Sequence, residues 1–194
     1  MKEKLISNLL IGEKIRKIRE EKGITATTLA EKCGLSRALI NQIEGDLISP
    51  PISTLLRIAD VLQINVGTLF KDEQLNQRTA VVRKDERLFS LRRQVSSNLK
   101  LGYTYETLAH TKAVKHMEPF LVTFEIKRED EIVRLSHNGE EFAFVLDGIL
   151  EFSNDTDVII LEPGDSIYFE SQYLHGFRAI GDKPAKALVV VYQQ

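Results

Sequence analysis

The stretch Thr25–Asp46, which reads TATTLAEKCGLSRALINQIEGD, decides the fold of the first half of this chain. Its first part, Leu29–Cys33, places apolar residues at helical spacing, and Gly34 then interrupts the run. Ser36 follows as a residue that can cap the start of a second helix. The stretch therefore predicts two short helices joined by a tight turn.

The second of these helices has two different faces. Ile40 and Ile43 stand three residues apart and are expected to point inward. The outward face has few acidic groups and several side chains of the kinds that read base edges in DNA. Pairs of amphipathic helices also occur in ordinary cores, so this pair alone leaves both interpretations open.

A wider pattern favours DNA binding. The segments IGEKIRKIREEKGIT before the pair and ISPPISTLLRIADVLQINVGTLF after it extend the pattern over Ile11–Phe70. The whole segment resembles the helix-turn-helix domain of the phage-repressor-like (XRE-type) family. The resemblance implies a five-helix domain whose partner is a double-stranded DNA operator. The side chains expected at the DNA are Thr27, Ser36, Arg37, Ala38, Asn41 and Gln42.

The flanking segments have structural roles in this resemblance. The first helix is expected at about Ile11–Lys22, a further helix from near Ser53, and a short last helix at Val66–Phe70. Arg19 and Glu44 are expected to form a buried ion pair between the first and third helices rather than to contact DNA.

Composition and length indicate a protein of the cytoplasm. The 194 residues suffice for two small domains, 43% of them are hydrophobic, and no apolar run approaches the length of a membrane span. The start, MKEKLISNLLIGEKIRK, has too short an apolar patch for a signal peptide. Cys33, the single cysteine, is expected to be a small buried hydrophobic residue.

The charge is divided unevenly along the chain. Residues 1–100 hold 18 Lys and Arg against 12 Asp and Glu, whereas residues 101–194 hold 8 against 16. The halves therefore carry net charges of +6 and −8. This asymmetry predicts that the first half meets phosphates and the second does not.

Residues 71–100, at the end of the first half, form a polar, basic segment between the helical and the barrel domains, with a strand predicted at Thr79–Arg83. Its basic side chains are interpreted as a solvated linker, with contact to the DNA backbone as the alternative. They are Arg83, Lys84, Arg87, Arg92 and Arg93. The predicted domains are residues 1–70 (helix-turn-helix), 71–100 (linker and first strand) and 101–194 (barrel).

From Leu101 onward the hydrophobic pattern alternates instead of following a helix. Seven short β-rich runs are separated by Asn-Gly, Asp-Gly, Gly-Asp and Pro-Gly-Asp turns. They read YTYETLA, FLVTFEI, EIVRLS, EFAFVLDGILEF, DVIILEP, SIYFES and ALVVVYQ. So many strands in under a hundred residues predict an antiparallel β-barrel or jelly roll. The fold class is therefore α+β, with two domains.

Two patches of this second half resemble the signature of the cupin family. SHNGEEFAFVLDG matches the spacing of the first cupin motif through His137, Glu141 and Gly148. PGDSIYFESQYLHGF matches the second motif through Gly164 and His175. The resemblance implies a cupin barrel that binds a small-molecule effector.

The same resemblance implies a metal site made of His137, Glu141 and His175. A three-residue loop places Glu141 opposite His137, whereas a two-residue turn would choose Glu140; the family pattern favours Glu141. Two histidines and one carboxylate suit one divalent ion of Fe, Zn, Ni or Mn. The alternative is a metal-free barrel whose histidines hydrogen-bond a ligand or the barrel wall.

The sequence departs from the cupin pattern at two positions. Leu135 stands where many metal-binding cupins have a further histidine, and Ala179 stands where the second motif often ends in asparagine. Any metal would therefore have at most three protein ligands from the motifs.

Two further features of the predicted barrel concern its ligand and its assembly. Tyr103 and Tyr105 alternate on one strand and share a face, which predicts an effector pocket, with core packing as the alternative. Phe142, Phe144 and Leu146 would make an apolar outer face, and a homodimer would bury it.

The sequence thus predicts a dimeric transcriptional regulator with a sensing barrel. The layout also resembles hydroxypropylphosphonate epoxidase, a cupin enzyme with non-haem iron, and this enzyme is the competing interpretation. In that resemblance a lysine near the end of the first helix reaches the substrate, but here Gly23 holds that position and Lys22 lies one place away. The DNA-reading set on the third helix also favours the regulator.

Overall fold

The computed structural model describes residues 10–70, 79–89, 102–112 and 115–193. The chain divides into two compact units. The first comprises residues 1–96 with 109–115, and the second comprises residues 97–108 with 116–194. No helix in the described ranges is long and apolar enough to cross a membrane.

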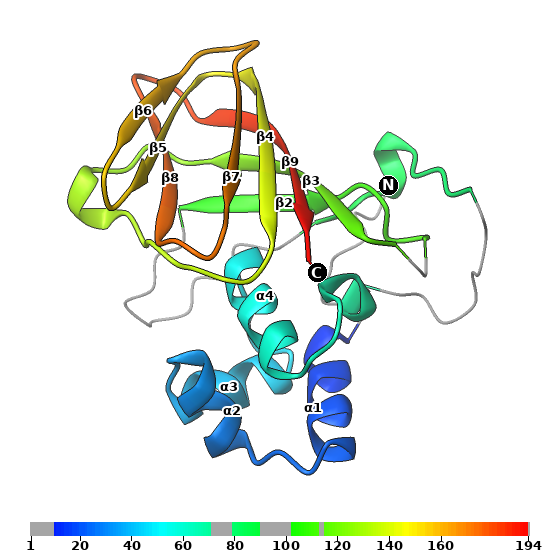
Figure 1. Ribbon diagram of the computed structural model, residues 1–194. Helices are drawn as coiled ribbons and strands as arrows, with labels where there is room; N and C mark the ends of the chain where they lie inside the picture. The colour runs from blue at the N-terminus through cyan, green and yellow to red at the C-terminus, as the bar shows by residue number, and fades with distance from the viewer. Residues whose placement is uncertain (1–9, 71–78, 90–101, 113–114, 194) are drawn as a thin grey trace. The chain divides into compact units, whose positions relative to one another are not determined.

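The first unit is helical, as predicted (Figure 1). Its elements are α1 (Ile11–Glu21), α2 (Ala26–Cys33), α3 (Arg37–Glu44), α4 (Ile52–Val61) and the 3-10 helix η2 (Val66–Phe70). The fifth predicted helix is thus present as a 3-10 turn. All four α-helices are shorter than isolated helices need to be for stability in water, so packing must hold them.

A continuous apolar core supplies that packing. Ile15, Leu29, Ile40 and Leu55 come from four different helices, and each is 0% exposed. Cys33 is 2% exposed, and its burial raises the pKa of the thiol to about 11. The predictions that Ile40 and Ile43 face inward and that Cys33 behaves as a buried hydrophobic residue are confirmed.

The start of α1 is capped from a distant part of the chain. The carboxylate of Asp46 accepts hydrogen bonds from the backbone N–H of Gly12 (2.8 Å) and of Glu13 (3.2 Å). A Cβ at position 12 would lie 2.0 Å from the carbonyl oxygen of Ile43, so only glycine allows this approach. The cap therefore fixes the start of α1 against the end of α3.

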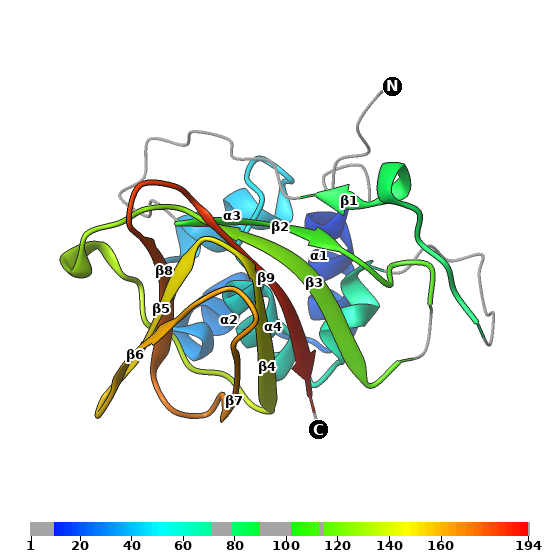
Figure 2. The same cartoon turned by 90° about the horizontal axis from the view of Figure 1, so that it is seen from above.

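The second unit is an antiparallel barrel of two facing sheets (Figures 1 and 2). The larger sheet contains the order β2-β3-β9-β4-β7, and the smaller sheet has the order β6-β5-β8. The strands are β2 (Tyr103–Thr107), β3 (Met117–Phe124), β4 (Glu140–Asp147), β5 (Ile149–Asn154), β6 (Val158–Leu161), β7 (Ser166–Glu170), β8 (His175–Ile180) and β9 (Ala185–Tyr192). The predicted fold class is confirmed.

Aromatic rings fill the space between the two sheets. Phe124 of the larger sheet packs on Phe177 of the smaller one, with ring centroids 5.4 Å apart. Phe152 and Phe169 make a second contact between the sheets at 4.9 Å. These pairs hold one end of the barrel together, because tilted aromatic contacts add to the free energy of burial.

Two of the predicted strands are wrong. Residues 79–83 form no strand in the described chain, and the first strand is instead β1 (Leu88–Phe89), which follows the 3-10 helix η3 (Lys84–Glu86). A run of β-prone residues becomes a strand only where another strand offers hydrogen bonds to it. Arg92 and Arg93 lie outside the described residues.

The run EIVRLS is the second wrong strand. Only Leu135 makes an isolated bridge, to His175, and η4 (Glu129–Glu131) precedes it. The run is anchored to the small sheet by side chains instead: Arg134 Nε donates to Ser153 Oγ at 3.2 Å. A Cβ at Gly176 would meet Ile132 at 2.7 Å, so the chain lies close against β8. This placement carries the chain directly to His137.

Candidate functional site

The helix pair α2–α3 has capped ends and a tight connection. Thr25 Oγ1 accepts from the backbone N–H of Thr28 at 3.0 Å, and Ser36 Oγ accepts from that of Leu39 at 3.1 Å. Gly34 has a φ of 63° and ends α2 in the left-handed region. The predicted cap at Ser36 is therefore confirmed, and its contact with DNA stays a prediction.

The residues predicted to contact DNA lie on the outside of this helix pair. Their exposure follows the helical period of α3 around the buried Ile40 and Ile43. Thr27, Ser36, Arg37, Ala38 and Asn41 are exposed, and Gln42 is half-buried. The surface is thus accessible, and Gln42 lies at its edge.

An ion pair holds α3 on α1. Arg19 Nε lies 2.6 Å from Glu44 Oε1, and Arg19 Nη2 lies 2.9 Å from Glu44 Oε2. The guanidinium also donates to the carbonyl oxygen of Ile24 at 2.8 Å. Side-chain exposure is 10% for Arg19 and 7% for Glu44, which confirms the predicted structural pair.

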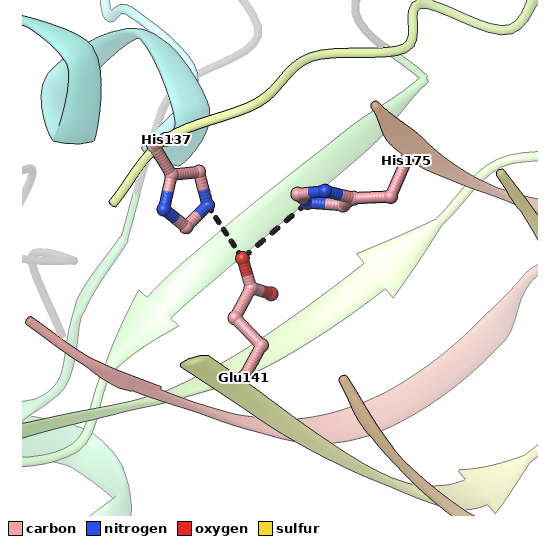
Figure 3. A group of neighbouring side chains, drawn as sticks. All are labelled: His137, Glu141 and His175. Atoms are coloured by element: carbon pink, nitrogen blue, oxygen red, sulfur yellow. Dashed lines mark hydrogen bonds and ion pairs between the residues drawn. The ribbon is translucent and has the colours of Figure 1, made fainter. Parts of the chain in front are cut away.

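The three predicted metal ligands converge inside the barrel (Figure 3). His137 Nε2 lies 2.6 Å from Glu141 Oε1, and His175 Nε2 lies 3.5 Å from the same oxygen. One ligand atom from each residue lies within 4.8 Å of the others, and all three side chains are buried. Ligands bonded to one metal at about 2.1 Å lie about 3.0–3.4 Å apart, so small shifts would let this set enclose an ion.

The local backbone explains why Glu141, and not Glu140, faces the histidines. Gly139 has a φ of 104°, and a Cβ there would lie 2.0 Å from the carbonyl oxygen of Tyr192. The loop that this glycine permits starts β4 with Glu140 outward and Glu141 inward, opposite Val191 of β9. The choice made from the family spacing is confirmed.

Hydrogen bonds at the far side of each ring define the histidine tautomers. His137 Nδ1 lies 3.1 Å from the carbonyl oxygen of Asn138, and His175 Nδ1 lies 2.9 Å from that of Tyr173. A carbonyl only accepts, so each Nδ1 carries a proton and donates it. If both rings are neutral, the lone pair of each Nε2 points at the carboxylate of Glu141. Lone pairs repel the carboxylate oxygen, so a proton or a metal ion must lie between the nitrogens and the carboxylate.

Burial alone would raise the pKa of Glu141. The hydrogen bonds and charges of His137 and His175 outweigh that effect and lower the pKa to about 2. The carboxyl group is therefore ionised at neutral pH, the state that a metal ligand requires. The donor set and its charge fit one divalent ion.

A cavity of about 430 Å³ opens beside His175. It is bordered by the β5–β6 turn on one side and by the chain between β7 and β8 on the other. Its lining residues are Phe152, Asn154, Asp155, Thr156, Phe169, Glu170, Tyr173 and His175. The volume suits a small organic molecule, and His175 links the cavity to the candidate metal site.

The two tyrosines predicted for an effector pocket do not line this cavity. Tyr105 is 2% exposed and packs edge-on against Phe120, with ring centroids 5.6 Å apart. Tyr103 is half-buried and contacts Phe124 at 5.8 Å. Their contact with an effector stays a prediction.

Sequence reasoning missed the aromatic walls of this cavity and the Asp46 cap. Phe152, Phe169 and Tyr173 come from different strands and loops, and their alternation within each run is also that of ordinary core residues. Only the position of Tyr173 two residues before the motif histidine was a usable signal. Asp46 had no local signal, because it caps a helix 34 residues earlier.

Comparison with known families matches both units. A helix-turn-helix family model matches residues 15–69, and a cupin domain model matches residues 120–191. The chain is 28% identical to the HTH-type transcriptional regulator PuuR of Escherichia coli over 169 residues, which span 86% of this chain and 85% of that protein. It is 31% identical to the immunity repressor protein of Bacillus phage phi105 over 118 residues, 57% of this chain and 81% of the repressor.

Solved structures give two further similarities. An HTH_3 family transcriptional regulator from Vibrio cholerae matches with a TM-score of 0.67 and 25% identity, over 95% of this chain and 96% of that one. Hydroxypropylphosphonic acid epoxidase from S. wedmorenis, in complex with fosfomycin, matches with a TM-score of 0.51 and 25% identity, over 94% and 97%. An iron(II) form of HppE matches at 0.52 and 26%, over 96% and 100%. The two-unit layout therefore occurs both in a regulator and in an iron enzyme.

Proposed function

We propose a detailed function for this chain, which belongs to the helix-turn-helix family of transcriptional regulators and carries a C-terminal cupin domain. It works in the cytoplasm as a homodimer, binds a DNA operator through α3, and responds to a small molecule in the cupin cavity. The observation that carries the proposal is the exposed face of α3, held in place by the buried Arg19–Glu44 pair.

The DNA contacts are assigned to the outside of α2 and α3. Arg37, Asn41 and Gln42 have the side-chain groups that pair with base edges in the major groove. Ser36 at the start of α3 contributes to a phosphate contact, because free backbone N–H groups at a helix start attract anions. Thr27 and Ala38 complete the proposed surface. The net charge of +6 on residues 1–100 favours approach to DNA.

A homodimer fits the way such helices read DNA. Two helix-turn-helix domains related by a two-fold axis place their reading helices in successive major grooves, about 34–36 Å apart. The operator is therefore expected to contain two inverted half-sites about 10 base pairs apart.

The cupin site is assigned to one divalent ion held by His137, Glu141 and His175. Iron, zinc, nickel and manganese all accept two imidazoles and a carboxylate. When bound, the ion would supply a Lewis-acidic centre for an oxygen-bearing group. The chain itself supplies the orientation of the ligands through the backbone carbonyls of Asn138 and Tyr173, and it excludes water by burial. The effector is assigned to the cavity beside His175.

Regulation then requires a difference in free energy between two arrangements of the dimer. An effector that favours one arrangement shifts operator affinity, and the operator shifts effector affinity by the same factor. Coupling of about 1–3 kcal/mol, or roughly 5- to 150-fold in affinity, is usual for such proteins.

A second candidate function is oxidation at a non-haem iron, as in HppE. The buried set of His137, Glu141 and His175 favours it, because two histidines and one carboxylate suit Fe(II). Position 23, where the epoxidase resemblance calls for a lysine, is a glycine with a φ of 67°, and Lys22 beside it is exposed. The DNA-reading surface has no use in an enzyme, so the regulator is preferred.

One experiment separates the two functions. The parent protein is mixed with a pool of random-sequence duplexes, and bound DNA is selected and sequenced at about 0.1 M salt. Enrichment of an inverted repeat supports the regulator. In parallel, iron(II)-loaded protein is given oxygen and hydroxypropylphosphonate. Turnover that requires all three ligands, without any enrichment of DNA, would replace the regulator by the enzyme.

A further inference from the structure

The edge strand β6 presents more apolar surface to solvent than any other strand segment of its length in the described barrel. Val158 is 59% exposed, Ile159 40% and Ile160 48%. The strand lies at the end of the β6-β5-β8 sheet, so no strand of the described residues pairs with one side of its backbone. Neither a proline nor a lysine lies within the strand, although such residues commonly protect exposed edges.

The pairing of β5 with β6 shows which backbone groups face the open side. Asn154 N donates to Asp157 O at 3.0 Å, so residues 154 and 157 form a hydrogen-bonded pair. Pairs alternate along an antiparallel ladder, and Phe152↔Ile159 is therefore the next hydrogen-bonded pair. Val158 and Ile160 lie between these pairs, so their N–H and C=O groups point away from β5.

The open side of β6 thus offers exposed apolar side chains together with backbone N–H and C=O groups that can pair with another strand. We propose that β6 pairs with β6 of a second copy of this chain, antiparallel, across a two-fold axis at Ile159. Val158 of one copy then lies opposite Ile160 of the other, and each such pair forms two backbone hydrogen bonds. The two small sheets join into one continuous sheet with the order β8-β5-β6-β6-β5-β8.

Charge and backbone hydrogen bonding favour the register with its axis at Ile159 over the registers shifted towards Ile160. With the axis at Ile159, the two acidic residues that flank the strand avoid each other: Asp157 lies opposite Leu161, and Glu162 lies opposite Thr156. A shift that puts the axis at Ile160 needs the backbone N–H of Glu162, which already donates to Asp165 Oδ2 at 2.9 Å. An axis between Ile159 and Ile160 would place Asp157 against Glu162, and like charges directly opposite destabilise strand pairs.

The proposed pairing would connect assembly with sensing. The chain enters β6 from the turn whose residues Asn154, Asp155 and Thr156 line the cavity beside His175. Asn154 Oδ1 accepts from the backbone N–H groups of Thr156 (2.8 Å) and Asp157 (2.6 Å), so the turn and the start of the strand move together. A ligand that shifts this turn would alter the angle between the two copies. This use of the pairing rests on the proposed function, but the pairing itself does not.

A cysteine substitution on the proposed axis tests the register. In Ile159→Cys the two new thiols face each other at a non-hydrogen-bonded pair, where Cα atoms are about 4.5 Å apart, within disulfide range. In the matched control Ile160→Cys the exposure is similar, but the Cα atoms of the two copies would lie about 8 Å apart, too far for a disulfide. Cys33 is 2% exposed with a pKa of about 11, so it does not compete.

The full-length variants are oxidised with diamide at micromolar concentration, and covalent dimers are measured over time. Cross-linking of Ile159→Cys at least about tenfold faster than of Ile160→Cys is the expected result. Equal slow rates in both would overturn the pairing, and faster cross-linking of Ile160→Cys would overturn the register.

Sedimentation of two lysine variants tests the same interface in case the cysteine substitutions disturb folding. Ile160→Lys is expected to sediment as a monomer, whereas Leu146→Lys, on the outer face of β4, is expected to stay a dimer. The reverse outcome would place the interface on β4 and overturn the proposal. DNA retention by the disulfide-linked Ile159→Cys dimer is measured separately; a cross-linked dimer that binds no DNA would contradict the proposed function and leave the pairing intact.

Discussion

Arg19 of α1 and Glu44 of α3 form a two-pronged ion pair, with distances of 2.6 and 2.9 Å, inside the helical unit. The pair joins the end of α1 to the end of α3. Because both side chains are largely buried, the loss of Arg19 would leave the Glu44 carboxylate without its ion-pair partner. The loss of Glu44 would leave Arg19 with a longer contact to Glu20, at 3.5 Å, and the carbonyl oxygen of Ile24. The orientation of α3 therefore depends on a contact on the side opposite its exposed face, for which we propose DNA binding.

The first prediction concerns this pair. Glu44→Ala should lower the free energy of unfolding of the helical unit by up to about 3 kcal/mol, because the buried guanidinium of Arg19 loses its two-pronged partner and keeps only the longer contact to Glu20 and the carbonyl of Ile24. The measurement is urea unfolding followed by helical circular dichroism at 222 nm. Arg16→Ala is the matched control: its ion pair with Glu20 is solvent-exposed, and its loss should change stability by about 0.5 kcal/mol or less. Equal effects of the two changes would contradict the structural role of the buried pair.

The second prediction concerns base reading by α3. Arg37→Ala or Gln42→Ala should each weaken operator binding by about 1–3 kcal/mol and relax the preference at one operator position. Affinities for the selected site and for single-base variants are measured by fluorescence anisotropy. Lys32→Ala, an exposed cation on α2, is the control for charge alone and should leave the base preference unchanged. An unchanged preference in both α3 variants would remove these residues from the reading surface.

The third prediction concerns salt. Operator affinity should fall linearly on a log–log plot against salt concentration, with a slope of about −0.9 for each phosphate contact. The reason is that Lys and Arg side chains release counterions from DNA when they bind. Anisotropy titrations between about 0.05 and 0.3 M salt give the slope. A flat response would argue against DNA as the partner.

The fourth prediction concerns acid stability of the metal-free protein. The pKa of Glu141 is lowered from 4.5 to about 2 in the folded state, so the unfolded state takes up the proton first as pH falls. The stability that ionised Glu141 contributes is therefore present above about pH 4.5 and is lost as pH falls towards 2.

Tyrosine fluorescence can follow this loss in the cupin unit alone, because all five tyrosines lie after residue 100 and the chain has no tryptophan. Urea unfolding is compared for the parent and Glu141→Gln across that pH range. The difference in stability between the two proteins should shrink as the pH falls. A constant difference would mean that folding does not lower the pKa of Glu141.

The sequence predicted most of the fold because local patterns determine it. The helical period around Ile40 and Ile43, the glycine at position 34 and the cap at Ser36 all act within a few residues, and all are found as expected. The alternation along β4 likewise predicted that Phe142, Phe144 and Leu146 lie on its outer face, and the three are more exposed than the buried Glu141. These local patterns predict the structure well because the residues that form each helix or strand also provide its buried apolar face.

The errors come from partners that lie far away in the sequence. Thr79–Arg83 and EIVRLS have β-prone residues, but the sequence cannot state whether a strand will lie beside them. Strand β8 was not among the seven predicted β-rich runs, and burial does not alternate from residue to residue along it. The cavity beside His175 combines residues from two separate stretches, 152–156 and 169–175, so its outline followed only from the folded chain.

In the proposed function, occupancy of the cupin site controls DNA binding by α3. The test measures the affinity of one selected operator for the parent protein and for a His137→Ala/His175→Ala variant. Each protein is measured with and without added divalent metal, and the concentration of any candidate effector is the same in all four measurements. Metal is expected to change operator affinity at least about fivefold in the parent and to have no effect in the variant, and the metal-free variant is expected to bind the operator as tightly as the metal-free parent. Calorimetry first confirms that the parent binds the metal. If the parent then binds the operator with the same affinity whether its metal site is filled or empty, occupancy of the site does not control DNA binding.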